Sequence, residues 1–294
     1  MILRDVRKNK QKTVLIITLF FIFISLFIYF LSLFLFNNVY LAAIIGLSVS
    51  GLSAFISYYN SDKMILKINN ARPATREEHL QLTVSLEALC ISAGLPMPKL
   101  YVMDTPALNA FATGRNPKHA VVCVTTGLLE KLDKYELEGV LAHELSHIKN
   151  YDILVSTVAI VMVGFITILA DLFTRSLLYG RGRSNDNKAA AVLLIIGLIF
   201  IILSPIAATL LKLAVSRNRE YLADSSAIEI ARNKEGLISA LKKLEEQTIP
   251  MEFNKATESL LIVPAISPNG KAKDSLWSTH PHTKNRINKL EKIQ

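Results

Sequence analysis

The chain has 294 residues, of which 51% are hydrophobic and only 19% are charged, and its formal net charge is +9. This composition is too apolar for a soluble domain of such length and is typical of a membrane protein, whose basic residues face anionic lipid head groups. The sequence has no zinc-finger spacing, no interleaved aromatic and basic residues and no glycine-rich phosphate loop, so we exclude nucleic acid as a partner.

Two uncharged apolar runs dominate residues 1–59. The first, 14–36, follows a basic N-terminal stretch; it is too long for a signal-peptide core, and no small-residue cleavage site follows it. The basic stretch places the N-terminus in the cytoplasm by the positive-inside rule. The second run, 39–59, has small residues on one face, which predicts a tight transmembrane hairpin. These residues are Gly46, Ser50, Ala54 and Ser57.

Residues 60–152 form a first soluble section. The capping-box pattern at Thr75 predicts a helix that runs to about Ser92 and ends before Gly94 and Pro96. Three short strands are expected at 100–103, 109–113 and 120–125, forming a small antiparallel sheet. An exposed edge of this sheet would hold a peptide substrate in extended form. The alternative is a purely structural meander.

Both cysteines lie in apolar runs of this first section. Cys90 and Cys123 are not spaced to bind zinc, and we interpret them as small buried thiols of a reducing compartment rather than as a disulfide.

Leucine and valine recur at intervals of three and four from Gly127 to Ile148, which predicts a helix. Near its end the chain reads His143-Glu144-Leu145-Ser146-His147, the pattern H-E-x-x-H. Residues four apart share a helix face, so His143 and His147 can bind one metal ion while Glu144 takes a proton from water. The alternative is a chance match on an ordinary amphipathic helix.

A third ligand is expected from the helix that contains Arg219, Glu220 and Asp224. Two histidines and the Glu220 carboxylate would leave a fourth position on zinc for water. Asp224, one turn later, would accept the outer N–H of a ligand histidine. Without the first motif, the same residues would describe a solvated, charged helix.

Two further apolar runs, 153–173 and 189–211, are expected to form a second hairpin, with a kink at Pro205. Because His143 and Glu220 must meet on one ion, an even number of crossings separates them. The basic loop 174–188 would prefer the cytoplasm, but the N-terminus and residues 60–150 carry stronger basic signals, so we place the loop outside. A shallow or buried hairpin is the alternative. Residues 212–294 form the second soluble section, which includes a helix near 236–247.

Several blocks in this order resemble the HtpX family of bacterial membrane zinc endopeptidases, which is distantly related to the CAAX prenyl proteases. They are two N-terminal apolar segments, Pro106-Ala107-Leu108-Asn109-Ala110-Phe111-Ala112-Thr113-Gly114, the H-E-x-x-H motif, Arg219-Glu220-Tyr221-Leu222-Ala223-Asp224 and Ser278-Thr279-His280-Pro281. The family block often doubles the proline, whereas this chain has Pro281-His282.

The resemblance implies one Zn²⁺ bound by His143, His147 and Glu220, with Glu144 catalytic. It also implies that His280 approaches the site, although the usual reading of His280 and His282 is surface histidines; Asn109 is a candidate substrate-binding residue. The expected fold is a mainly α membrane protein with about four transmembrane helices and a cytoplasmic α+β zincin-like catalytic domain.

The expected function is hydrolysis of misfolded or damaged membrane proteins at the cytoplasmic side of a bacterial cell membrane. The alternatives are a membrane chaperone or scaffold with a structural zinc site, and a prenyl-protein processing peptidase. A structural site normally closes all four zinc positions with protein ligands, and no cysteine or fourth histidine is suitably spaced for that.

Overall fold

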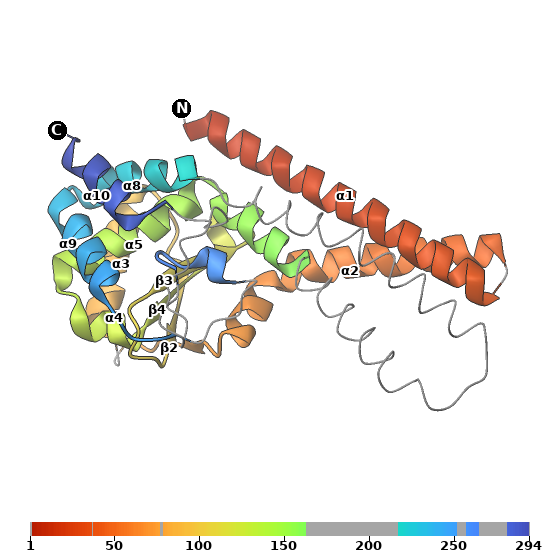
Figure 1. The fold of residues 1–294 in the computed structure, drawn as a ribbon, viewed down its shortest axis with the longest axis horizontal. Helices are drawn as coiled ribbons and strands as arrows, with labels where there is room; N and C mark the ends of the chain where they lie inside the picture. The colour runs from red at the N-terminus through yellow and green to blue at the C-terminus, as the bar shows by residue number, and fades with distance from the viewer. Residues whose placement is uncertain are drawn as a thin grey trace.

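A long helical hairpin projects from a rounded body in the computed structural model (Figure 1). The structure describes residues 2–36, 38–76, 79–162, 217–251, 257–264 and 281–293. The hairpin consists of α1 (Ile2–Phe36) and α2 (Val39–Ile68). The body contains the sheet and the remaining helices, and the N-terminal end of α1 lies beside it.

The hairpin is tight because small residues of α2 face α1. A Cβ added at Gly46 would lie 2.9 Å from the carbonyl oxygen of Ser25, and the hydroxyl groups of Ser25 and Ser50 are 2.6 Å apart. Asn38 begins α2 by accepting a hydrogen bond from the Leu41 backbone N–H at 3.0 Å. The small-residue face therefore lies at the α1–α2 contact, as the sequence indicates.

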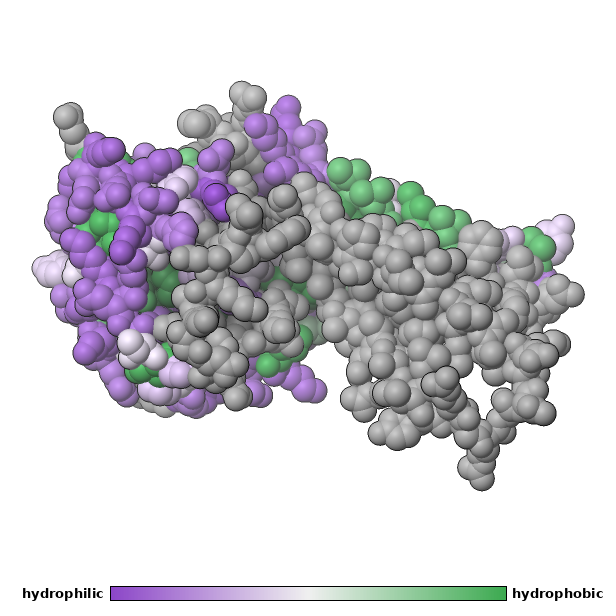
Figure 2. All heavy atoms as spheres, viewed as in Figure 1, coloured by the Kyte–Doolittle hydropathy of each residue, from purple (hydrophilic) through white to green (hydrophobic). Residues whose placement is uncertain are grey.

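Two stretches of this hairpin, Arg7–Leu26 and Val39–Ile56, are long and apolar enough to cross a membrane. Large apolar side chains are exposed along them, and Figure 2 shows hydrophobic surface on the hairpin beside a mainly hydrophilic body. Of the other two predicted spans, the structure describes only the helix Asp152–Met162. The remainder of 153–173, and all of 189–211, lie outside the described residues.

The helix Asp152–Met162 packs against α1. One stripe of α1 side chains is buried against one face of this helix, which follows the H-E-x-x-H helix in the chain. The apolar residues of this contact are Ile16, Phe20, Ile24, Leu154, Val155, Val158, Ala159 and Met162. The hairpin is therefore part of the body's packing.

The sheet is mixed, so the prediction of an antiparallel sheet was wrong. Its strands are β1 (Arg72–Pro73), β2 (Lys99–Met103), β3 (Ala110–Gly114) and β4 (Ala120–Thr125), in the order β1-β2-β4-β3. The turn after Gly114, whose φ of +136° suits glycine, returns the chain antiparallel to β3. β4 lies between β3 and β2 in the sheet, and it runs parallel to β2. β3 is left as an edge strand.

The other helices of the described residues are α3 (Leu80–Ala93), α4 (Thr126–Lys131), α5 (Lys134–Lys149), α8 (Arg217–Ala231), α9 (Lys234–Glu246) and α10 (Thr283–Glu291), with 3₁₀ turns η1 (Pro117–His119) and η2 (Glu258–Leu260). α3 begins at Leu80, later than the capping-box pattern predicts, and the Ala74 N–H donates to the Leu100 carbonyl, which continues the pairing of β1 with β2. It ends at Gly94, as predicted, with φ +67°.

The helix predicted from Gly127 to Ile148 is two helices. Asp133 begins α5 with a capping box, in which its side chain accepts from the Glu136 N–H and the Glu136 side chain accepts from the Asp133 N–H. α5 then crosses α9 closely: a Cβ on Gly139 would lie 2.7 Å from the Leu237 nitrogen. α5 is thus fixed at the centre of the core, where Val140, Leu141 and Leu145 are fully buried.

Cys90 and Cys123 are buried, free thiols. Burial raises the pKa of Cys90 to about 11. The prediction of small buried thiols is confirmed.

Candidate metal centre

Three predicted ligands meet at one point. α5 presents His143 and His147 on one face, and α8, packed against α5, presents Glu220. The two Nε2 atoms are 3.2 Å apart, and the Glu220 carboxylate oxygens lie 3.7 Å from His143 Nε2 and 3.6 Å from His147 Nε2. These residues line a common cleft.

The donor set fits zinc. Ligand atoms at the corners of a tetrahedron with bonds of about 2.0–2.1 Å lie roughly 3.3 Å apart, and the three measured separations of 3.2, 3.6 and 3.7 Å are close to this value. Two imidazole nitrogens facing each other at 3.2 Å must share either the hydrogen of an N–H···N bond or a metal ion. The set of two nitrogens and one carboxylate is also the one that zinc takes in hydrolases.

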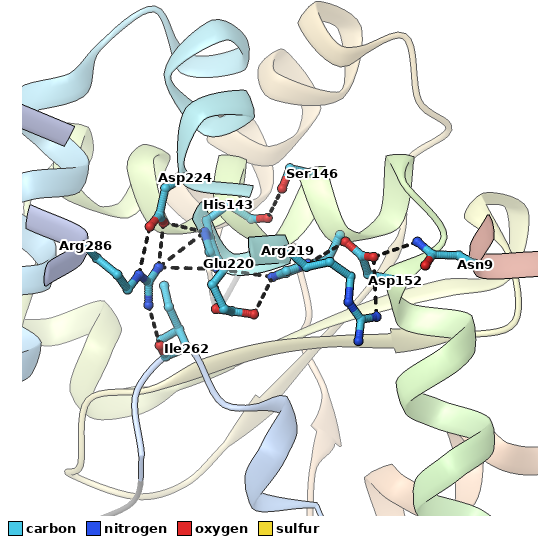
Figure 3. Close-up of polar contacts among 10 residues, drawn as sticks. Asn9, His143, Ser146, Asp152, Arg219, Glu220, Asp224, Ile262 and Arg286 are labelled. Carbon is cyan, nitrogen blue, oxygen red and sulfur yellow. Dashed lines mark hydrogen bonds and ion pairs between the residues drawn. The ribbon is translucent and has the colours of Figure 1, made fainter. Parts of the chain in front are cut away.

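Asp224 lies against the outer nitrogen of the His143 ring. Its Oδ1 lies 3.0 Å from His143 Nδ1, which leaves Nε2 directed at the metal position. Asp224 is in turn held by Arg286 of α10, whose Nε and NH2 groups donate to the two carboxylate oxygens at 2.9 and 2.6 Å (Figure 3). Burial would raise the pKa of Asp224, but the Arg286 charge and the hydrogen bonds outweigh it and lower the pKa.

The pKa of His143 is lowered by its burial and by the nearby Arg286 guanidinium, despite the opposing effect of Asp224. A neutral imidazole is the form that binds a metal ion.

His147 has a corresponding partner in Asp152, the first residue of the next helix. Asp152 Oδ2 lies 3.1 Å from His147 Nδ1. Its Oδ1 accepts a hydrogen bond from Asn9 Nδ2 at 2.8 Å and lies 3.6 Å from Arg219 NH1 (Figure 3). Burial opposes the protonation of His147, but Asp152 and the other carboxylates outweigh it and raise its pKa to about 9. Metal binding must therefore displace a proton from His147.

Glu144 lines the same cleft and is almost fully buried, with 2% of its surface exposed. Burial raises the pKa of Glu144 to about 7; the charge of His147 opposes this, and that of Glu220 adds to it. The Ala112 backbone N–H donates a hydrogen bond to the Glu144 carboxylate. A carboxylate with a pKa near 7 can both accept and return a proton at neutral pH.

The edge strand β3 forms one wall of the cleft through Ala112. Beside it, the Ile262 backbone N–H donates to the Ala110 carbonyl at 3.0 Å, so the chain itself covers the start of this edge. Asn109 is buried and donates from Nδ2 to the Val263 carbonyl at 3.1 Å. The described contacts of Asn109 thus hold the segment that lies over the edge. His280 lies outside the described residues.

Three residues of the site were not predicted from the sequence. Asp152 offered a usable signal, because it is an acid at the start of an apolar run, five residues after His147. Arg286 and Asn9 offered none, because they are remote in sequence from the residues that they hold.

Comparison with known proteins supports the same chemistry. The sequence profile of peptidase family M48 matches residues 75–294, which include all three ligands. The protease HtpX homolog of Listeria monocytogenes is 40% identical over the full length of both chains. That of Dictyoglomus thermophilum is 45% identical over 97% of this chain and 92% of the relative.

Among solved structures, the crystal structure of S. mikatae Ste24p matches with a TM-score of 0.48 and 19% identity, over 94% of this chain and 62% of that one. The family profile and the full-length relatives, together with the cluster of His143, His147 and Glu220, establish the family. The chain belongs to peptidase family M48 and is a zinc-binding membrane metalloprotease, homologous to HtpX.

Proposed function

We propose that this metalloprotease is an endopeptidase of the bacterial cell membrane that cleaves misfolded or damaged membrane proteins on the cytoplasmic side. The hydrogen bond from Asn9 to Asp152 supports this orientation, because it ties the N-terminal end of α1 to the metal centre. That end of the chain is basic and belongs in the cytoplasm by the positive-inside rule. The metal centre then faces the cytoplasm.

The observation that carries the proposed reaction is the position of Glu144, buried beside the ligand pair in the same cleft. Bound zinc supplies Lewis acidity, which polarises the scissile carbonyl and makes water acidic enough to be deprotonated. Glu144 accepts the proton from the attacking water and then passes it to the leaving amine nitrogen. Asp224 and Asp152 hold the two imidazole rings in place throughout.

The edge of β3 is the proposed binding site for the substrate main chain. An extended segment can add to an exposed sheet edge through backbone hydrogen bonds, which is selective for unfolded polypeptide and tolerant of sequence. Ala112 lies at this edge and donates its N–H to Glu144, so a segment that pairs there and takes over this N–H would pass the metal centre. This geometry suits a quality-control protease, whose substrates share disorder rather than a motif.

The reaction is tested with Glu144→Gln, which keeps the shape of the side chain and removes the base. The purified protein in detergent is stripped with chelator, reloaded with zinc and incubated with unfolded casein. We expect Glu144→Gln to bind one zinc and to lose cleavage by at least about a thousandfold. The control is Glu229→Gln on the exposed side of α8, which should cleave like the wild type. Undiminished cleavage by Glu144→Gln would refute the role, and zinc binding without cleavage by the wild type would favour a structural site.

The substrate class needs a separate comparison in reconstituted vesicles. One unfolded segment is presented either fused to a transmembrane helix or free in solution. The proposal expects faster cleavage of the fused form, because the enzyme and substrate then share the membrane. Equal rates would remove the preference for membrane proteins, and cleavage of a prenylated peptide alone would indicate a prenyl-protein processing enzyme.

A further inference from the structure

The first membrane helix places a buried amide against the metal centre. Asn9 lies near the N-terminal end of α1 and is only 5% exposed. Its Nδ2 donates to Asp152 Oδ1 at 2.8 Å and to the Asn150 carbonyl at 2.9 Å. Both N–H bonds of one amide are therefore used, and only the NH₂ group can satisfy two oxygens at once. Figure 3 shows the side chain pointing from α1 towards Asp152.

The two acceptors belong to the tight turn that joins α5 to the next helix. Asn150 ends α5, and Tyr151 adopts a left-handed conformation with φ +59°. This conformation is unfavourable for a tyrosine and persists only where the surroundings hold it. α1 supplies that support, because Asn9 bonds the turn on both sides of Tyr151 and Lys10 lies 4.4 Å from the centre of the Tyr151 ring.

The turn also sets the direction of the Asp152 carboxylate. With Oδ1 held by Asn9, Oδ2 faces His147 Nδ1 at 3.1 Å, and His147 Nε2 faces the other ligands. A carboxylate that orients a ligand histidine is itself usually held by hydrogen bonds. The chain of contacts therefore runs from the membrane helix through Asp152 to His147.

We propose that Asn9 is a positioning residue of the zinc centre, which acts through Asp152 on His147, so that the first membrane helix contributes to the metal site. Packing alone does not account for this residue. Ile16, Phe20 and Ile24 already pack α1 against the same helix, and a leucine at position 9 would pack without the cost of burying an amide. The inference concerns the metal site and is independent of which polypeptides the enzyme cleaves.

The test compares Asn9→Ala, Asp152→Ala and the double variant in the full chain. Zinc affinity is measured by competition with a chromophoric chelator, and the ligand field by the visible absorption of Co²⁺ added in place of zinc. We expect Asp152→Ala to weaken zinc binding about 10–100-fold, as is typical for partners of ligand histidines. Asn9→Ala should weaken it by about fivefold or more and change the Co²⁺ spectrum. The double variant should bind no more weakly than Asp152→Ala, because Asn9 acts through Asp152.

Two control variants distinguish an effect of Asn9 on the metal site from a general loosening of α1 against the body. Gln11→Ala alters an exposed residue on the same turn of α1 and should leave both readouts unchanged. Ile16→Ala loosens the packing of α1 without touching Asp152, so it should lower the melting temperature and leave the Co²⁺ spectrum as in the wild type.

Asn9→Asp is a second variant of the same shape, which places a carboxylate against Asp152 and should weaken zinc binding more than Asn9→Ala. Three results would each overturn the proposal. They are wild-type zinc affinity in both Asn9 variants, additive losses in the double variant, and an Ile16→Ala protein with the same spectral change as Asn9→Ala.

Discussion

Arg286 and Asp224 form a buried, bidentate ion pair, and Asp224 also contacts the ligand His143. Arg286 is 1% exposed and Asp224 is 2% exposed, and the two contacts measure 2.6 and 2.9 Å. The remaining nitrogen of Arg286 donates to the Ile262 carbonyl at 2.8 Å. One guanidinium thus joins α10, the zinc-ligand partner and the segment that lies over the edge of β3.

Arg286→Met should strongly destabilise the protein, by about 3–5 kcal/mol, because it leaves the Asp224 carboxylate buried without its partner. Denaturant unfolding in detergent measures this loss, and the zinc content should fall with it. Lys284→Met on the exposed side of α10 is the control and should change stability by less than about 0.5 kcal/mol. Equal stability of the two variants would show that the pair does not hold the site.

Zinc should stabilise the fold as well as the reaction. A thousandfold excess over the dissociation constant adds about 4 kcal/mol by mass action, so the melting temperature should rise when zinc is returned to chelated protein. Glu144→Gln should keep this rise, whereas His147→Ala should lose most of it. A rise retained in His147→Ala would place the ion elsewhere.

Acid should weaken the contact between α5 and α9 through Glu136. Burial would raise the pKa of Glu136, but hydrogen bonds from Lys243, Ser239 and the Asp133 backbone, with the Lys243 charge, lower it below its ordinary 4.5. A carboxyl whose pKa is lower in the folded state than in the unfolded state stabilises the fold at pH values above its unfolded pKa. This stabilisation is lost as the pH falls through the folded-state pKa. Stability from this group is therefore complete above about pH 4.5 and declines below it.

Glu136→Gln should flatten the acid limb of stability against pH and should cost about 1.5–3 kcal/mol at pH 7, because it weakens charged hydrogen bonds. Glu291→Gln, from an exposed pair with Lys242 at 3.9 Å, should leave the acid limb unchanged. Unfolding curves at several pH values provide the comparison, and an unaltered acid limb in Glu136→Gln would contradict the assignment.

Gly46→Ala should loosen the hairpin. The new Cβ would lie 2.9 Å from the Ser25 carbonyl oxygen and 3.2 Å from the Tyr29 nitrogen, and backbone atoms cannot easily move away. We expect a loss of about 1–3 kcal/mol. Gly51→Ala on the same helix meets only a Phe21 side-chain atom at 3.9 Å and should be tolerated. Thermal stability in detergent distinguishes them, and equal melting temperatures would show that close approach at Gly46 is unimportant.

The metal ligands could be predicted because their geometry is local. His143 and His147 are related by one turn of helix, and Glu220 and Asp224 by another, so each pair follows from helical spacing. Periodicity does not predict the break at Asp133, because the leucine pattern continues across it, although the capping box Asp133–Glu136 is present in the sequence. Here turn chemistry outweighed periodicity.

The contacts that complete the site are long-range and carry no periodic signal. Arg286 reaches Asp224 across 62 residues, and Asn9 reaches Asp152 across 143. The prediction of an antiparallel sheet was wrong for a similar reason, since the parallel pairing of β2 with β4 depends on where β3 lies in space. Sequence patterns report which face a residue occupies, but not which distant face it meets.

The docking of α1 sets the distance of the metal centre from the exposed apolar part of the hairpin. Asn9 is level with Asp152, and Val14, 62% exposed, is the first large apolar side chain exposed in the part of α1 whose side chains the structure describes, from Arg7 onwards. The five residues from Asn9 to Val14 span about 8 Å of helix. α1 therefore holds the metal site at a constant distance from the exposed apolar surface of the hairpin. Cleavage should then fall within a short, constant distance of a substrate's last membrane residue. A substrate domain that is folded tightly against the membrane would not be cleaved until it unfolded.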